Sequence, residues 1–401
     1  MITRAFLAAC VALAWLAGAG QATAQPALVP PYTVAYQPVG VDEIGWWREM
    51  DEEEAVLAQS DLVIRDETLN AYVRKVLCDT VGSDRCNAVR IYIVRAPFFN
   101  ASMTANGTMR VFTGLLLRVQ NEAELGTVLG HEFGHFENRH ILGKFKARRS
   151  GTDVLAWAAV LGSLAPSYDV VRTYRNLEFS IYGNLYRYGR DQEREADRLA
   201  IAYLNNSALR PQAASQMWDN LMAEAEASAR GRGLKKPKFD AIAFAASHPP
   251  NAERAGYLAE LARPDAATRD DGAERYREAL APWLGMFLDD QIKLNDFGAS
   301  EYLLQALAQG GWTAQLHHAR GELYRMRGAP RDLVNAAQFY ADAIALDPAH
   351  AEANRGLGLS LLKTGQAGAG QAALQRYLDL KPDASDARLI RMMIPDQGAA
   401  Q

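Results

Sequence analysis

The sequence is short of cysteine, has no excess of basic residues and lacks long apolar runs beyond its N-terminus. Its 401 residues include three cysteines, and 43 basic residues against 47 acidic ones leave a formal net charge of −4. That balance offers no basic surface for nucleic acid and argues against a DNA- or RNA-binding protein. No later run reaches the roughly 20 apolar residues of a membrane span. Residues 154–165 come closest and are too short.

What is present begins with an export signal. Arg4 gives a short positive region, residues 5–17 are apolar, and Ala22-Thr23-Ala24 is a small-x-small cleavage pattern. We therefore expect residues 1–24 to be a secretory signal peptide, with an uncleaved anchor as the alternative. The mature protein would start at Gln25. The alanine-rich style of the segment is typical of bacteria, which predicts a periplasmic location.

Two cysteines, Cys78 and Cys86, remain after cleavage. In an exported protein two nearby cysteines most simply form one disulfide. Closing so small a loop contributes about 2–3 kcal/mol to stability in the chain-entropy model. A catalytic thiol is the alternative.

The pattern of apolar residues indicates an α+β fold that is mostly α. It predicts a helix over residues 66–78 and a strand over 88–95. Asn106-Gly107 lies between two short β-like stretches and predicts a type I′ hairpin. Residues 25–48 contain four prolines and are expected to form an extended lead-in. A small sheet should therefore precede the helix expected over 121–141.

That helix carries His131-Glu132-Phe133-Gly134-His135. Residues four apart lie on one face of a helix, so two imidazoles can hold one zinc ion. Glu132 between them can act on a water bound to the same metal. Glu132 also lies on the apolar stripe, where a carboxylate is costly unless it is paired, protonated or near a metal. A polar helix face without a metal is the alternative.

A second helix, beginning near residue 190, supplies the third ligand that a catalytic zinc usually needs. Glu193 shares the buried face marked by Ala196 and is predicted to be that ligand. Asp197 points partly inward, where it can hydrogen-bond a ligand histidine. Glu195 lies on the charged face and is expected to be a solvated surface residue. His140 follows His135 by five residues, off the metal face, and is expected to be structural.

Together these motifs resemble metallopeptidase family forty-eight, the group that includes the CAAX prenyl proteases. That family pairs H-E-x-x-H with a downstream E-x-x-x-D, here Glu193 to Asp197. The resemblance covers roughly residues 50–265, and further matching segments are Asn100-Ala101-Ser102, Thr113-Gly114-Leu115-Leu116 and Asn138-Arg139-His140. It implies a zincin-like domain with one zinc ion per chain, held by His131, His135 and Glu193, and Glu132 as the catalytic residue. Residues 103–105, where many relatives carry a proline, depart from the pattern and leave the shape of the hairpin open.

His248-Pro249-Pro250 resembles a segment of the exported, repeat-bearing members of that family. In that subgroup the histidine can sit on the zinc and block the water. His248 is therefore predicted to be a switchable fourth ligand that restrains activity, and the alternative is that it only precedes a helix. Residues 141–189 are either two packed helices, a lid or plug over the cleft, or a surface that touches the membrane.

The C-terminal third repeats. Pro348 and Pro382 are 34 residues apart, the tetratricopeptide period. Small or aromatic residues recur at helix-packing positions before each proline, including Ala336, Tyr340 and Leu374. About three helix pairs should form a short α-solenoid that binds protein segments or partners. A generic helical bundle is the alternative.

These expectations divide the chain at positions 1–24 (signal peptide), 25–48 (lead-in), 49–265 (zinc metallopeptidase), 266–275 (linker), 276–392 (tetratricopeptide-like repeats) and 393–401 (flexible tail). The leading hypothesis is a zinc endopeptidase that cleaves exported proteins, with repeats that recruit unfolded substrates or an outer-membrane assembly partner. Quality control of outer-membrane proteins is implied by the family resemblance alone. The alternatives are a chaperone or binding module with a structural zinc, and an enzyme kept silent by His248.

Overall fold

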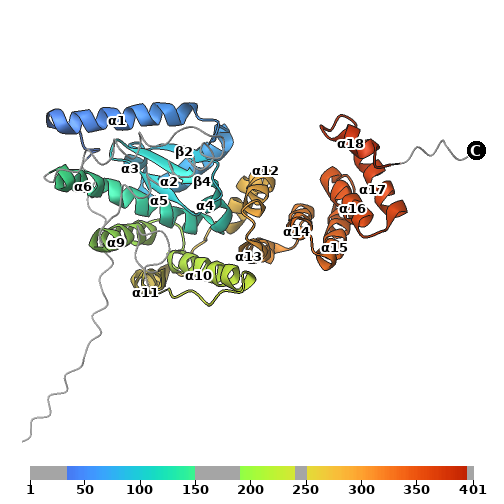
Figure 1. The fold of residues 1–401 in the computed structure, drawn as a ribbon. Helices are drawn as coiled ribbons and strands as arrows, with labels where there is room; N and C mark the ends of the chain where they lie inside the picture. The colour runs from blue at the N-terminus through green and yellow to red at the C-terminus, as the bar shows by residue number, and fades with distance from the viewer. Residues whose placement is uncertain (1–33, 150–189, 240–250, 395–401) are drawn as a thin grey trace, which may run out of the picture.

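The computed structural model describes residues 34–149, 190–239 and 251–394, which form a compact N-terminal body and a helical arm (Figure 1). The predicted signal peptide, most of the segment predicted as lid or packed helices, and His248 lie outside the described residues. Within the described residues, no helix is both long and apolar enough to cross a membrane.

The body begins with a helix, and a small sheet follows. In chain order the elements are α1 (Gly40–Gln59), β1 (Val63–Ile64), α2 (Glu67–Val81), α3 (Ser83–Cys86), β2 (Arg90–Val94), β3 (Ala101–Met103) and β4 (Thr108–Phe112). The sheet order is β1-β2-β4-β3, with β2 and β4 parallel and the other pairs antiparallel. The predicted helix over 66–78 and the predicted strand over 88–95 are both confirmed.

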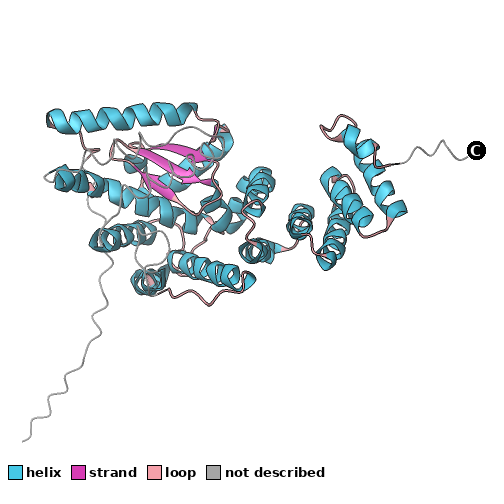
Figure 2. Cartoon of the chain, viewed as in Figure 1, coloured by secondary structure: helices cyan, strands magenta, loops and turns pink. Residues whose placement is uncertain are grey.

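Helices make up the rest of the chain, and Figure 2 shows the sheet as a small layer among them. The body continues through α4 (Thr113–Arg118), α5 (Glu122–Glu137), α6 (His140–Arg149), α9 (Arg190–Asn206), α10 (Ala213–Gly231) and α11 (Asn251–Leu261). After a short 3-10 turn, Pro264–Ala266, come α12 (Ala273–Ile292), α13 (Phe297–Leu307), a 3-10 turn Ala308–Gly310, α14 (Ala314–Arg327), α15 (Pro330–Leu346), α16 (Ala351–Lys363), α17 (Ala367–Leu380) and α18 (Ala387–Arg391). The predicted mostly helical α+β fold is confirmed.

Side chains alternate across the sheet, so that α1 covers one face and α2 and α5 cover the other. Arg90, Tyr92 and Thr108 donate hydrogen bonds to Glu54 of α1. The opposite face, with Ile93 among its residues, joins the hydrophobic core against α2 and α5. This period-two alternation is the signature of a sheet covered differently on its two faces, and it sets β4 and β3 beside α5.

Two details of the expected N-terminal structure were wrong. Of the segment predicted as an extended lead-in, the described residues 34–39 form no helix or strand, but α1 already begins at Gly40. The β3–β4 hairpin is present, but it is not type I′, since Gly107 has a positive φ and Asn106 does not. Gly107 N–H instead bonds to the Thr104 carbonyl at 3.1 Å, which makes a turn closed by a glycine bulge.

Helix α5 is shorter than expected. It ends at Glu137 rather than near residue 141. Arg139 follows with a left-handed φ of 55°, which breaks the helix. His140 then opens the separate helix α6, so its direction cannot be read from the periodicity of α5.

A stripe of glycines lets α5 and α9 pack closely. A Cβ at Gly134 would lie 3.3 Å from the Cα and carbonyl oxygen of Ala196, and one at Gly130 would lie 3.5 Å from the Cα of Ala200. Both alanines are fully buried. Small residues on facing helices allow the axes to approach, and this approach brings the start of α9 to the His131–His135 turn.

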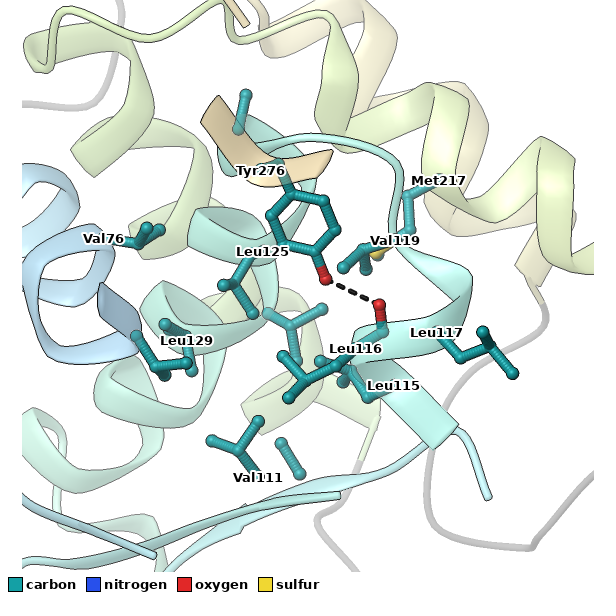
Figure 3. Packing of buried hydrophobic residues seen from close by; sticks show 14 of the residues in the cluster. Val76, Val111, Leu115, Leu116, Leu117, Val119, Leu125, Leu129, Met217 and Tyr276 are labelled. Atoms are coloured by element: carbon teal, nitrogen blue, oxygen red, sulfur yellow. Dashed lines mark hydrogen bonds between the residues drawn. The ribbon is translucent and has the colours of Figure 1, made fainter. Parts of the chain in front are cut away.

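The hydrophobic core of the body continues into the first helices of the arm. Tyr276 of α12 is buried beside Leu125 and Val119, and its hydroxyl donates a 2.7 Å hydrogen bond to the Leu116 carbonyl (Figure 3). The same cluster of buried residues runs on to Leu323 in α14. Residues 266–275, predicted as a linker, therefore pass between packed elements.

The arm consists of antiparallel helix pairs. Tyr340 of α15 is fully buried and fits between two glycines, since a Cβ at Gly321 or Gly356 would come within 2.6 or 2.3 Å of its ring. Its hydroxyl donates to Glu322 at 2.6 Å. This interlocking of neighbouring pairs is the packing expected of a short solenoid.

Two cysteines form the expected disulfide. Cys78 and Cys86 are bonded and join the end of α2 to α3.

Candidate metal centre

Three side chains from α5 and α9 converge on one point. The Nε2 atoms of His131 and His135 are 3.1 Å apart, and the Glu193 carboxylate oxygens lie 3.5 and 3.6 Å from them. A tetrahedral zinc with ligand bonds of about 2.0–2.1 Å separates its ligand atoms by about 3.3–3.4 Å. The donor set and its spacing therefore fit a zinc ion. Among the described residues, this is the one group of three or more such side chains close enough to hold a metal.

Glu132 lies beside these three groups and is almost fully buried. The backbone N–H of Met103, in β3, donates a hydrogen bond to its carboxylate. Burial nevertheless raises the pKa of Glu132 to about 7. A carboxylate with a pKa near neutrality is well suited to accept a proton from water and to give it up again.

Asp197 supports His131 from behind. Its Oδ1 is 2.8 Å from His131 Nδ1, so Nδ1–H donates and Nε2 is left for a metal. Burial would raise the pKa of Asp197, but the charges of Arg254 and His131 hold it well below its usual range. Asp197 thus lies against His131, one of the two histidines predicted to bind the metal.

Arg254 and Tyr257 of α11 hold Asp197 in place. Arg254 Nε donates to Asp197 Oδ2 at 2.8 Å, and the Tyr257 hydroxyl donates to the same oxygen. The Arg254 guanidinium lies 3.9 Å above the ring of Trp218 and is 2% exposed. A buried arginine is tolerated here because the carboxylate pairs with it and the ring covers it.

His135 is contacted by His140, which the sequence pattern predicted to be structural. His140 does not face the metal position, as expected, but its Nδ1 is 2.9 Å from His135 Nδ1. Glu195 was expected to be solvated. Its side chain is 57% exposed, yet its Oε2 lies 3.2 Å from His140 Nε2. Both residues therefore connect to the site.

Few of these supporting residues can be recognised from sequence patterns. Arg254 and Tyr257 lie more than fifty positions from Asp197 in the chain, and helix periodicity does not relate residues so far apart. Helix periodicity places His140 off the metal face, as the structure does, but it does not indicate the contact with His135, which depends on the turn at Arg139. The predicted gate His248 lies outside the described residues.

A small pocket opens next to the site. It is bounded by the turn between β3 and β4, by the end of α5, and by two aromatic residues of the N-terminal segment. Its lining is mainly apolar, with one cation, and comprises Tyr36, Trp47, Ala105, His135, Phe136, Arg139, Ile141 and Leu142. The guanidinium of Arg139 lies 4.7 Å from the Tyr36 ring, which anchors the N-terminal wall.

Comparison with known families gives two matches. Residues 63–262 match "Peptidase family M48", and residues 326–395 match "Tetratricopeptide repeat". The first match spans the sheet, α5, α9 and α11, so it contains every residue of the site described above. The resemblance inferred from the motifs, and the succession of a metallopeptidase domain and helical repeats, are confirmed.

Individual relatives share the first region. A Vibrio cholerae protein provisionally named beta-barrel assembly-enhancing protease is 30% identical over 175 residues, 42% of this chain and 36% of its own. Metalloprotease YcaL of Escherichia coli is 32% identical over 161 residues, 40% of this chain and 56% of its own. Mitochondrial metalloendopeptidase OMA1 of Schizosaccharomyces pombe is 27% identical over 209 residues, 52% of this chain and 57% of its own. The aligned part is thus well under two thirds of each of these relatives.

Proposed function

Because the chain belongs to peptidase family M48 through residues 63–262, we propose that it is a zinc-dependent endopeptidase. The observation that carries the proposal is the convergence of His131, His135 and Glu193 around one point with Glu132 beside them. Three protein ligands and one open position are the usual plan of a catalytic zinc, whereas structural sites are closed by four.

The residues of the chain divide the chemistry between them. A zinc ion held by His131, His135 and Glu193 would supply Lewis-acid chemistry, lowering the pKa of a water toward about 7 and polarising a carbonyl. Glu132 would accept a proton from the attacking water and pass it to the amine that leaves when the C–N bond breaks. Asp197 and Arg254 keep His131 in the tautomer that presents Nε2. Burial of the whole group excludes competing water from the charged side chains.

The free edge of β3 provides a place for the substrate. β3 is the edge strand of the sheet. Asn100 O accepts from Phe112 N, and Thr104 N donates to Thr108 O. In an antiparallel ladder this leaves the backbone groups of Ala101 and Met103 facing away from β4. The Met103 N–H already donates to Glu132, so the groups left for a peptide are those of Ala101 and the Met103 carbonyl. An extended peptide pairing there, by β-augmentation, would place its carbonyl next to Glu132.

We propose that the pocket beside His135 accepts an apolar side chain of that peptide. Its walls include Trp47 and Ile141, and its floor is formed by the end of α5. An apolar side chain next to the cleaved bond would pack against this mainly apolar lining and lose part of its contact with water. Unfolded proteins expose such side chains and folded ones hide them, which favours unfolded substrates.

The cellular role follows from the expected signal peptide, the repeats and one relative. A beta-barrel assembly-enhancing protease is among the similar proteins, and tetratricopeptide arrays bind protein segments. We therefore propose a periplasmic protease in outer-membrane protein quality control, with the arm recruiting substrate or an assembly partner. The proposal retains His248 as a gate on the metal.

The test compares wild type with Glu132→Gln on casein and on an unfolded barrel protein, each with and without a chelator. Glu132→Gln should keep its zinc and lose cleavage by about 10²–10⁴-fold, the usual contribution of a general base. Glu260→Gln, on the exposed side of α11, is the control and should cut like wild type. Binding of substrate without cleavage under every condition would favour the chaperone alternative.

A further inference from the structure

The two ligand histidines have the same requirement. Each presents Nε2 to the metal position, so each must carry its proton on Nδ1 and donate it to a fixed acceptor. His131 donates to the buried carboxylate of Asp197. His135 instead faces another imidazole, that of His140, at 2.9 Å.

The proton positions in this second arrangement are constrained. A contact between two ring nitrogens needs one donor and one acceptor. With Nδ1–H on His135, the His140 Nδ1 must accept, and the proton of neutral His140 must then reside on Nε2. That Nε2 lies 3.2 Å from Glu195 Oε2, so it donates to the carboxylate. The chain of hydrogen bonds runs from His135 through His140 to Glu195 in one direction.

His140, in the middle of this chain of hydrogen bonds, is buried, whereas Glu195 at its end is exposed to solvent. His140 is 5% exposed, and its ring stands 5.0 Å from that of His135 at 69°. Arg139, with φ 55°, reverses the chain and returns His140 against α5. Glu195 reaches it from α9, the helix that also provides Glu193, and its side chain is 57% exposed.

We propose that His140 and Glu195 are positioning residues of the metal centre, a relay that fixes the tautomer and ring orientation of His135. The inference rests on the proposed function, in which His135 Nε2 binds the metal. The two histidines are thus oriented in different ways. His131 bonds to a buried carboxylate that is paired with a guanidinium, and His135 bonds through His140 to a solvent-exposed carboxylate.

The test is zinc affinity, measured by chelator competition, with the visible spectrum of the cobalt-substituted protein as a second readout. His140→Leu removes the acceptor and should weaken zinc binding by about 10–100-fold and shift the cobalt bands. His140→Asn places Oδ1 near the former Nδ1 and should recover most of that loss. Leucine at this position with wild-type affinity and spectrum would overturn the relay.

Variants of Glu195 provide a second test. Because Glu195 is exposed, these variants remain informative if His140→Leu does not fold. Glu195→Ala should weaken zinc binding by several-fold, while Glu195→Gln, whose amide oxygen still accepts, should retain it. Asp191→Ala is the matched control, because Asp191 is a fully exposed carboxylate on the same helix, near Arg194. Equal losses in Glu195→Ala and Asp191→Ala would indicate long-range charge and refute the hydrogen-bonded link. Wild type that binds zinc but cuts no protein would contradict the proposed function and leave these affinity results valid.

Discussion

Three carboxylates are buried around a single point, and each is compensated by a different means. Asp197 is paired with Arg254. Glu132 accepts the N–H of Met103 and has a raised pKa. Glu193, with no exposed surface, faces the Nε2 atoms of two imidazoles. A carboxylate in that position is costly in the absence of a cation, so metal should stabilise the fold as well as the reaction.

Zinc binding should release protons at neutral pH. Burial alone would lower the pKa of His131, but the charge of Asp197 and its hydrogen bond outweigh that effect and raise it to about 9 in the metal-free protein. Below pH 9 the metal must therefore displace a proton from His131, and affinity should rise about tenfold per pH unit up to that point. Calorimetry in two buffers of different ionisation enthalpy measures this directly.

The expected release at pH 7 is at least one proton per zinc. A zinc affinity that is flat between pH 6 and 8, with no buffer dependence of the heat, would show that His131 is already neutral. Asp197→Asn serves as the control, because removing the negative charge lowers the pKa of His131 and should reduce the release.

At the scale of elements, the metal site depends on how closely α5 and α9 approach. Glu193 comes from one turn before Ala196, whose backbone touches Gly134. The position of the third ligand is thus set by a glycine on the helix that carries the other two. A substitution that slightly widens that contact should displace Glu193 without unfolding the protein.

Gly134→Ala should therefore weaken zinc binding while leaving thermal stability little changed. The new Cβ would sit 3.3 Å from the backbone of Ala196, which must shift by a few tenths of an ångström. The gain in helix propensity, about 1 kcal/mol, offsets part of the strain. Zinc affinity and melting temperature are the two measurements.

Gly130→Ala is the matched control on the same stripe. Its Cβ would meet Tyr203 at 3.4 Å and Ala200 at 3.5 Å, close to ordinary van der Waals distances. It should bind zinc like wild type and melt at the same or a slightly higher temperature. Equal effects of the two alanines on zinc affinity would contradict the role assigned to the Gly134 contact.

The elements show which parts of the site could be anticipated. His131, Glu132 and His135 share one helix, and Glu193 and Asp197 share another, so local periodicity was sufficient to orient them. Arg254, Tyr257 and the direction of His140 depend on tertiary packing or on one left-handed residue, Arg139. Neither tertiary packing nor a single left-handed residue produces a periodic pattern in the sequence. The prediction of a type I′ hairpin is wrong for a related reason, because a turn closed by a glycine bulge at Gly107 also accommodates an Asn-Gly pair.

At the scale of the whole molecule, the peptidase body and the arm are not separate in their packing. Phe287, Leu288 and Ile292 of α12 are buried in the core cluster that also contains Leu116 and Leu125. Full burial of each side chain contributes about 1.5–3 kcal/mol, and the sum approaches the entire stability of an ordinary domain.

Truncation should reveal this dependence. A chain ending at Gly272 loses α12 and exposes the core around Leu116, so its urea midpoint should fall sharply and zinc binding with it. A chain ending at Gly328 keeps the cluster, which runs to Leu323, and should unfold close to the full-length midpoint. Equal midpoints for the two truncated chains would show that α12 belongs to the arm alone.

The packing of α12 also bears on how the arm works. Tyr276 bonds to Leu116, and Arg275 pairs with Glu122 at the start of α5. A flexible tether would let a captured chain explore a wide volume, with its effective concentration falling as the tether lengthens. Because these contacts fix the arm to the body, we expect any protein segment that the repeats bind to be held at one distance and in one orientation from the metal centre.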